Sequence, residues 1–121
     1  MKIYKSAEDY LECILVLQQK NAKVISLDIA IAMNYSKPSI SRAMKNLREN
    51  GYIEVDNDGY INLTKKGLSI AEKIYDRHVT LTNYFISLGV AKDVAAEDAC
   101  KIEHDISDET FDAIKATLNR S

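Results

Sequence analysis

The stretch from residue 36 to residue 63 constrains the fold of this chain more than any other. It reads SKPSISRAMKNLRENGYIEVDNDGYINL, in which Ser36 can cap a helix, Pro38 suits its first turn and Gly51 suits its end. Alternating apolar residues then flank the turn sequence DNDG, which predicts a β-hairpin. Because a short apolar helix is also expected at 26–34, the order is typical of a winged helix-turn-helix.

The other helices follow from the spacing of apolar residues and from capping residues. We expect them at 6–20, 64–88, 91–105 and 107–120, with Ser6, Thr64 and Ser107 at three of the starts and Gly89 after the second. The predicted fold is mainly α with a small β-hairpin wing. We expect an N-terminal winged helix-turn-helix over 1–72 and a second helical region over 73–121, with a soft boundary near 70–78.

Charge is distributed unevenly along the 121 residues, although the net charge is only −2. Residues 1–90 carry 12 basic and 10 acidic side chains, whereas residues 91–121 carry 4 basic and 8 acidic ones. The mildly basic front suits contact with phosphate, and the acidic tail suits binding of cations or of a partner.

Apolar runs are too short to span a bilayer, and the start MKIYKSAEDY lacks the apolar core of a signal peptide. We therefore expect a cytoplasmic protein that does not enter a membrane. In that reducing compartment a disulfide between Cys13 and Cys100 is not expected.

The helix that begins at Ser36 carries the candidate DNA contacts, because the second helix of this motif lies in the major groove. Its serines can bind phosphates or bases, its basic side chains attract phosphate, and Arg42 can also reach a guanine edge. Pro38 can rest against a thymine methyl. The candidates are Ser36, Lys37, Pro38, Ser39, Ser41, Arg42 and Lys45. The alternative is a solvated polar helix in a small α/β domain.

A second pattern, CKIEH at residues 100–104, predicts a metal site. Cys100, Glu103 and His104 have the spacing i, i+3 and i+4, which places them on one face of a helix. A thiolate, a carboxylate and an imidazole together suit a borderline first-row transition metal. Taken singly, the same residues are more often a small buried thiol, a solvated carboxylate and a helix-end imidazole.

Further ligands for such a site have to come from elsewhere in the chain. The candidates are Asp9 and Glu12 on the first predicted helix and His78 on the long one. Cys13 lies on the apolar stripe of the first helix and is expected in the core, although it follows Asp9 by four residues and a role near the site stays open.

Four segments, in order, resemble one known family, the metal-dependent transcriptional repressors typified by DtxR and MntR. SAEDYLECI resembles the family's first helix, and SKPSISRAMKNLRENGYI its recognition helix and the start of its wing. YDRHVTL resembles the segment with a metal-binding histidine, and CKIEHDIS the ligand-bearing helix. The resemblance implies a ligand set made of Asp9, Glu12, His78, Cys100, Glu103 and His104.

The same resemblance implies a homodimer, built by the last helices, that binds a palindromic operator in double-stranded DNA. It implies a repressor of metal-ion homeostasis in which bound metal joins the first helix to the dimerisation region, 73–121. Fe²⁺ and Mn²⁺ are both compatible, and Co²⁺, Ni²⁺ or Zn²⁺ can bind in vitro. Cys100 looks like the iron branch, whereas Asp9, Glu12 and His78 look like the manganese branch. One principal metal is expected, since Thr82 and Ala96 cannot serve a second iron-branch site, and a second, weaker metal stays open.

Two rival functions follow from the same sequence. A winged-helix regulator that senses a small organic ligand would need an apolar pocket, which Tyr75, Tyr84 and Phe85 could line. A hydrolytic metalloenzyme would need a catalytic motif, yet the chain has no HExxH, no nucleophile elbow and no Gly-rich phosphate loop. We therefore do not expect an enzyme.

Overall fold

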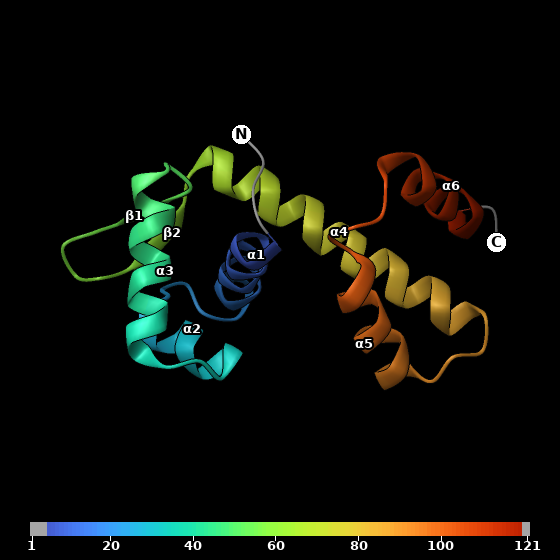
Figure 1. Cartoon of the computed structure of the whole chain (residues 1–121), viewed down its shortest axis with the longest axis horizontal. Helices are drawn as coiled ribbons and strands as arrows, with labels where there is room; N and C mark the ends of the chain where they lie inside the picture. The colour runs from blue at the N-terminus through green and yellow to red at the C-terminus, as the bar shows by residue number, and fades with distance from the viewer. Residues whose placement is uncertain (1–4, 120–121) are drawn as a thin grey trace. The chain divides into compact units, whose positions relative to one another are not determined.

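The computed structural model of the chain describes residues 5–119, which form six helices and one two-stranded antiparallel sheet. In chain order these elements are α1 (Lys5–Lys20), α2 (Ser26–Met33), α3 (Lys37–Glu49), β1 (Ile53–Val55), β2 (Ile61–Leu63), α4 (Lys65–Ser87), α5 (Lys92–Ile102) and α6 (Asp108–Asn119) (Figure 1). The predicted fold class, mainly α with a hairpin wing, is confirmed. The described residues up to Glu72 form one compact unit, and those from Lys73 onward form a second.

The first unit is a winged helix-turn-helix. Helix α2 packs against α1 and α3, while β1 packs against α3 and β2 against α1 (Figure 1). The wing pairs Ile53 with Leu63 and Val55 with Ile61, so its apolar residues share one face. Every element of the unit contributes to one buried core, whose members include Leu11, Ile14, Ile29, Ile40, Met44, Leu47, Ile53, Ile61 and Ala71.

Local capping accounts for the starts of α3, α4 and α6. The Ser36 hydroxyl accepts a hydrogen bond from the Ser39 amide at 3.3 Å, and the Thr64 hydroxyl accepts one from the Gly67 amide at 3.2 Å. Ser107 Oγ likewise accepts from the Thr110 amide at 3.1 Å. Helix α1, however, already includes Lys5, so the prediction that Ser6 caps it is wrong.

The second unit comprises the rest of α4 together with α5 and α6. Leu81, Ala99 and Phe111 form its buried core, one from each helix, and Phe85 packs against them. Helix α5 ends at Ile102 and not at Asp105 as predicted, and the amides of residues 105 and 106 both bond to the Ile102 carbonyl. Within residues 5–119, no helix combines the length and apolar character needed to cross a membrane.

Candidate functional site

The seven predicted DNA contacts all lie on α3 or at its first turn. Six of them are exposed, and Ser39 is half-buried. Ser36 and Ser39 are already engaged with each other, since Ser36 Oγ donates to Ser39 Oγ at 2.8 Å. Arg42 Nη2 donates to the same Ser39 oxygen at 3.4 Å. The structure therefore presents one exposed polar and basic face, and direct contact with DNA stays a prediction.

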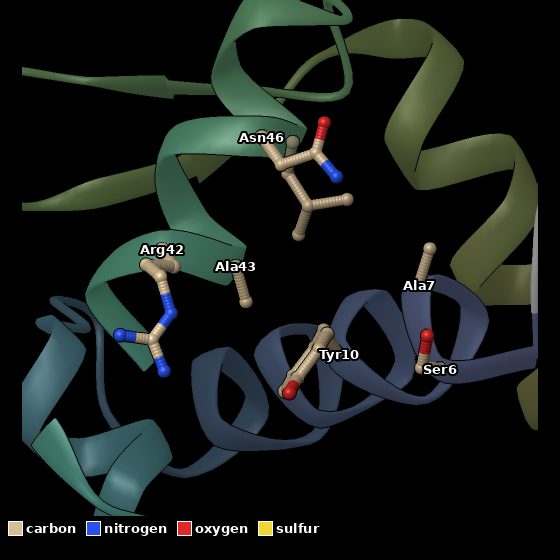
Figure 2. A pocket seen from close by; sticks show the side chains of 7 residues that line it. Ser6, Ala7, Tyr10, Arg42, Ala43 and Asn46 are labelled. Atoms are coloured by element: carbon tan, nitrogen blue, oxygen red, sulfur yellow. The ribbon is translucent and has the colours of Figure 1, made fainter. Parts of the chain in front are cut away.

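Two cavities lie beside this face. The larger, of about 240 Å³, lies between α1 and α3, and Figure 2 shows Ser6 and Tyr10 of α1 across from Arg42 and Asn46 of α3. The smaller, of about 190 Å³, is lined by Ser26, Leu27, Lys37 and Ser41. Each cavity combines serine hydroxyls with a basic side chain of α3, which suits a DNA phosphate. Sequence reasoning missed Ser6 and Ser26 because only tertiary packing brings them to α3.

In the second unit, three predicted metal ligands converge. Their ligand atoms on His78, Cys100 and Glu103 all lie within 4.8 Å of one another. Helix α4 supplies the imidazole, α5 the thiol, and the turn after α5 the carboxylate. Glu103 Oε2 lies 2.9 Å from His78 Nδ1, and Oε1 lies 3.5 Å from His104 Nε2. Glu103 therefore has both histidines of the chain as neighbours.

Glu103 lies close to both Cys100 and His104, although the helix predicted to carry all three residues is shorter than expected. Since α5 ends at Ile102, Glu103 and His104 lie in the turn that follows it. The His104 side chain is only 2% exposed and Glu103 is completely buried, whereas Cys100 is exposed. The turn thus directs the carboxylate inward while leaving the thiol accessible.

The donors present fit a bound transition metal. Glu103 Oε1 is buried and makes no hydrogen bond among the described residues, and the 3.5 Å contact to His104 is long for one. A buried carboxylate oxygen left in this state is costly unless a cation or a donor satisfies it. Because metal–donor distances are about 2.0–2.3 Å, two donors on one ion lie within roughly 4.6 Å of each other. The three donor atoms lie within 4.8 Å of one another, and the His78–Glu103 pair lies at 2.9 Å, so their spacing is compatible with one shared ion.

Asp9 and Glu12, the other two predicted ligands, lie on α1 in the first unit, where both are half-buried. They remain predictions. Cys13, the next residue, packs against the core of the first unit. Burial, with a smaller contribution from the Glu12 carboxylate, raises the pKa of the Cys13 thiol to about 11. A thiol that stays protonated is a poor nucleophile and a poor metal ligand.

These environments predict different reactivities for the two thiols. In the folded, metal-free protein, iodoacetamide at pH 8 should alkylate Cys100 readily and Cys13 at least tenfold more slowly. At pH 8 a thiol with a pKa near 11 is about 0.1% thiolate, and Cys13 is also half-buried. Mass spectrometry of Cys13→Ala and Cys100→Ala variants measures each rate separately. Equal rates in the folded state would contradict the assigned environments.

A winged helix-turn-helix joined to a unit with a thiol, an imidazole and a buried carboxylate defines the class of metal-responsive transcriptional regulators. The family model described as the iron-dependent repressor N-terminal DNA binding domain matches residues 2–68. The model of the same repressor's metal binding and dimerisation domain matches residues 64–121. The chain therefore belongs to the iron-dependent repressor family, which confirms the resemblance to the DtxR and MntR repressors.

Individual relatives agree with this assignment. The chain is 33% identical over 118 residues to an HTH-type transcriptional regulator of Methanocaldococcus jannaschii, covering 96% of this chain and 94% of that one. It is 32% identical over 108 residues to the transcriptional regulator MntR of Escherichia coli O157:H7, covering 89% and 70%. The solved structure of the manganese regulator SloR has a TM-score of 0.82 and 30% identity, covering 100% of this chain and 56% of its own. The chain thus spans about half the length of that solved relative.

Proposed function

We propose that this protein is a homodimeric repressor that binds a palindromic DNA operator when a divalent transition metal occupies the Glu103 site. The observation that carries the proposal is the buried Glu103 carboxylate, with one oxygen that makes no hydrogen bond among the described residues, beside His78 and Cys100. The same chain carries an exposed basic recognition helix. The residues that support metal sensing are therefore different from those that support DNA binding.

The proposed ligands are Glu103, His78, Cys100 and His104, and the family resemblance adds Asp9 and Glu12 of α1. A bound divalent cation supplies positive charge to carboxylates and a thiolate that otherwise repel one another. Since Asp9 and Glu12 belong to the DNA-binding unit, their participation would couple metal binding to that unit. Cys100 favours Fe²⁺ over Mn²⁺, because thiolate is a soft ligand and affinities rise from Mn²⁺ to Fe²⁺.

Exposed apolar side chains in the second unit support the proposed dimer. Leu88 is 63% exposed, and Val94, Val79, Ile86 and Ile102 are also exposed. Large apolar side chains that gather on a surface mark interaction sites. Phe85, Ile106, Phe111 and Ile114, by contrast, pack within the unit. We expect a second copy of the chain to cover part of this exposed group.

The proposal is tested by measuring DNA affinity with and without metal. The DNA is a duplex selected by the metal-loaded protein from a random-sequence pool. Mn²⁺, or Fe²⁺ without oxygen, should tighten binding about 5- to 150-fold, the range of a typical coupling free energy. Arg42→Ala should weaken binding in both states, since Arg42 lies on the DNA face and not in the metal site. Equal wild-type affinities with and without metal would reject metal control.

A further inference from the structure

Arg77 of α4 is a buried cation that bonds to the turn carrying Glu103 and His104. It is only 5% exposed. Its Nη1 donates to the Glu103 carbonyl at 3.0 Å and to the Ile106 carbonyl at 2.6 Å. Its Nη2 donates to the Asp108 carboxylate. One side chain thus holds both ends of the turn between α5 and α6.

These bonds explain where α5 stops. The last carbonyls of a helix lack partners within it, and a buried carbonyl without a donor is costly. Arg77 supplies that donor to the Glu103 carbonyl, and its charge also suits the negative end of the α5 dipole. The Glu103 amide still bonds to the Ala99 carbonyl at 3.0 Å, as in a helix, whereas the Glu103 carbonyl accepts from Arg77.

Helix α4 therefore holds Glu103 at two points through consecutive residues. Arg77 bonds to its main-chain carbonyl, and the next residue, His78, contacts its carboxylate at 2.9 Å. With the main chain of residue 103 fixed, its side chain is directed into the cluster with His78 and Cys100. Without the Arg77 bond, the main chain at residue 103 would be free to rotate the Glu103 carboxylate away from His78 and Cys100.

We propose that Arg77 is a positioning residue for the metal site, which sets the direction of Glu103 and His104 without being a ligand. This inference rests on the proposed metal-dependent function. A guanidinium is needed because it is planar and presents several N–H groups at once, whereas an ammonium is a point charge on a flexible stem. The guanidinium bonds, and the nearby Lys73, hold the pKa of the Asp108 carboxyl below its usual value, so Asp108 stays charged as the third partner.

Co²⁺ alone is the probe for this proposal, because a thiolate bound to Co²⁺ gives a charge-transfer absorption. The full-length chain is titrated with Co²⁺ in competition with a chelator, for the wild type, Arg77→Met and Arg77→Lys. Loss of a residue that orients a ligand typically weakens metal binding about 10- to 100-fold. We expect that loss and a weaker absorption for Arg77→Met, and only partial recovery for Arg77→Lys.

Lys115→Met is the matched control. Like Arg77, Lys115 is a cation that joins two helices of the unit, because its Nζ bonds to Asp76 of α4 at 2.8 Å. Both cations also lie near the Phe111 ring, at 5.9 Å from its centre for Lys115 Nζ and 5.5 Å for the Arg77 guanidinium carbon. The bond from Lys115 to α4 is made through Asp76 and not through the turn at residues 103–106. Thermal melts without metal are measured for every variant. Because Lys115 and Asp76 are both partly exposed, Lys115→Met should change the melting temperature little and bind Co²⁺ within about twofold of the wild type.

A merely structural Arg77 gives a different result. Arg77→Met would then melt at a lower temperature but bind Co²⁺ as tightly as Lys115→Met, and the proposal would be overturned. If Arg77→Met does not fold, Arg77→Lys decides alone, since full wild-type affinity and absorption would overturn the requirement for a guanidinium. A wild type that binds no Co²⁺ would instead remove the proposed function on which the inference rests.

Discussion

Replacing Glu103 with glutamine is expected to abolish stabilisation by metal while leaving the metal-free protein at least as stable as the wild type. The side chain is completely buried, and its Oε1 makes no hydrogen bond among the described residues. Burying a charged carboxylate costs more than burying a neutral amide of the same shape. Glutamine can keep the contact with His78 but cannot provide an anionic oxygen to a cation.

Thermal melts with and without Mn²⁺ or Co²⁺ measure both parts of this prediction. At a free metal concentration one hundred times the dissociation constant, binding stabilises the wild type by about 2.7 kcal/mol. For a chain of this size that corresponds to a rise in melting temperature of about 10 °C. Glu103→Gln should show no rise, and its metal-dependent tightening of DNA binding should disappear with it.

Glu97→Gln is the control for Glu103→Gln, because it removes one carboxylate from α5 outside the site. Its side chain is 71% exposed and faces Lys101 one turn along at 3.7 Å. Exposed pairs of this kind contribute little to stability, so the metal-induced shift should match the wild type. If Glu103→Gln kept the full shift, the metal would be bound elsewhere. If it melted well below the wild type without metal, the buried carboxylate would be stabilising the fold by itself.

Elements whose ends are set by local chemistry were predictable from the sequence. The Ser36–Pro38 start of α3, the Thr64 and Ser107 caps and the hairpin around DNDG each depend on residues within a few positions of one another. The apolar stripe of α3 was predictable for the same reason. Ile40, Met44 and Leu47 recur at helical spacing, and all three are buried.

The end of α5 was not predictable, because no local signal marks it. The sequence ACKIEHDIS has no glycine or proline near residue 103 and continues to fit a helix pattern. The helix ends where Arg77, 26 positions earlier in the chain, donates to the Glu103 carbonyl. Sequence spacing therefore identified Cys100, Glu103 and His104 as candidate ligands but placed the end of their helix three residues too late, at Asp105 and not at Ile102. It also gave no sign that Arg77 would be buried beside them.

The second large effect is expected at Gly67, in the first turn of α4. A Cβ atom added there would lie 2.0 Å from the Tyr52 carbonyl oxygen, far inside a normal contact. Tyr52 cannot easily move away, because its carbonyl accepts from the Thr64 amide at 3.1 Å and its amide donates to the Leu47 carbonyl at 3.0 Å. Gly67→Ala must therefore shift the backbone where α3, the wing and α4 meet.

In an ordinary helix interior, alanine would be more stable than glycine by about 0.5–1 kcal/mol. Here we expect the opposite sign, a loss of about 3 kcal/mol, at the upper end of the usual cost of overpacking. Urea unfolding of Gly67→Ala and of the control Ser69→Ala measures this loss in the free energy of unfolding. Ser69 is exposed on the same helix, so its replacement should be neutral or slightly stabilising. A Gly67→Ala variant as stable as the Ser69→Ala control would mean that α4 does not approach Tyr52 this closely. A loss confined to Gly67→Ala would show that α4 approaches the Tyr52 carbonyl too closely to admit a side chain at residue 67.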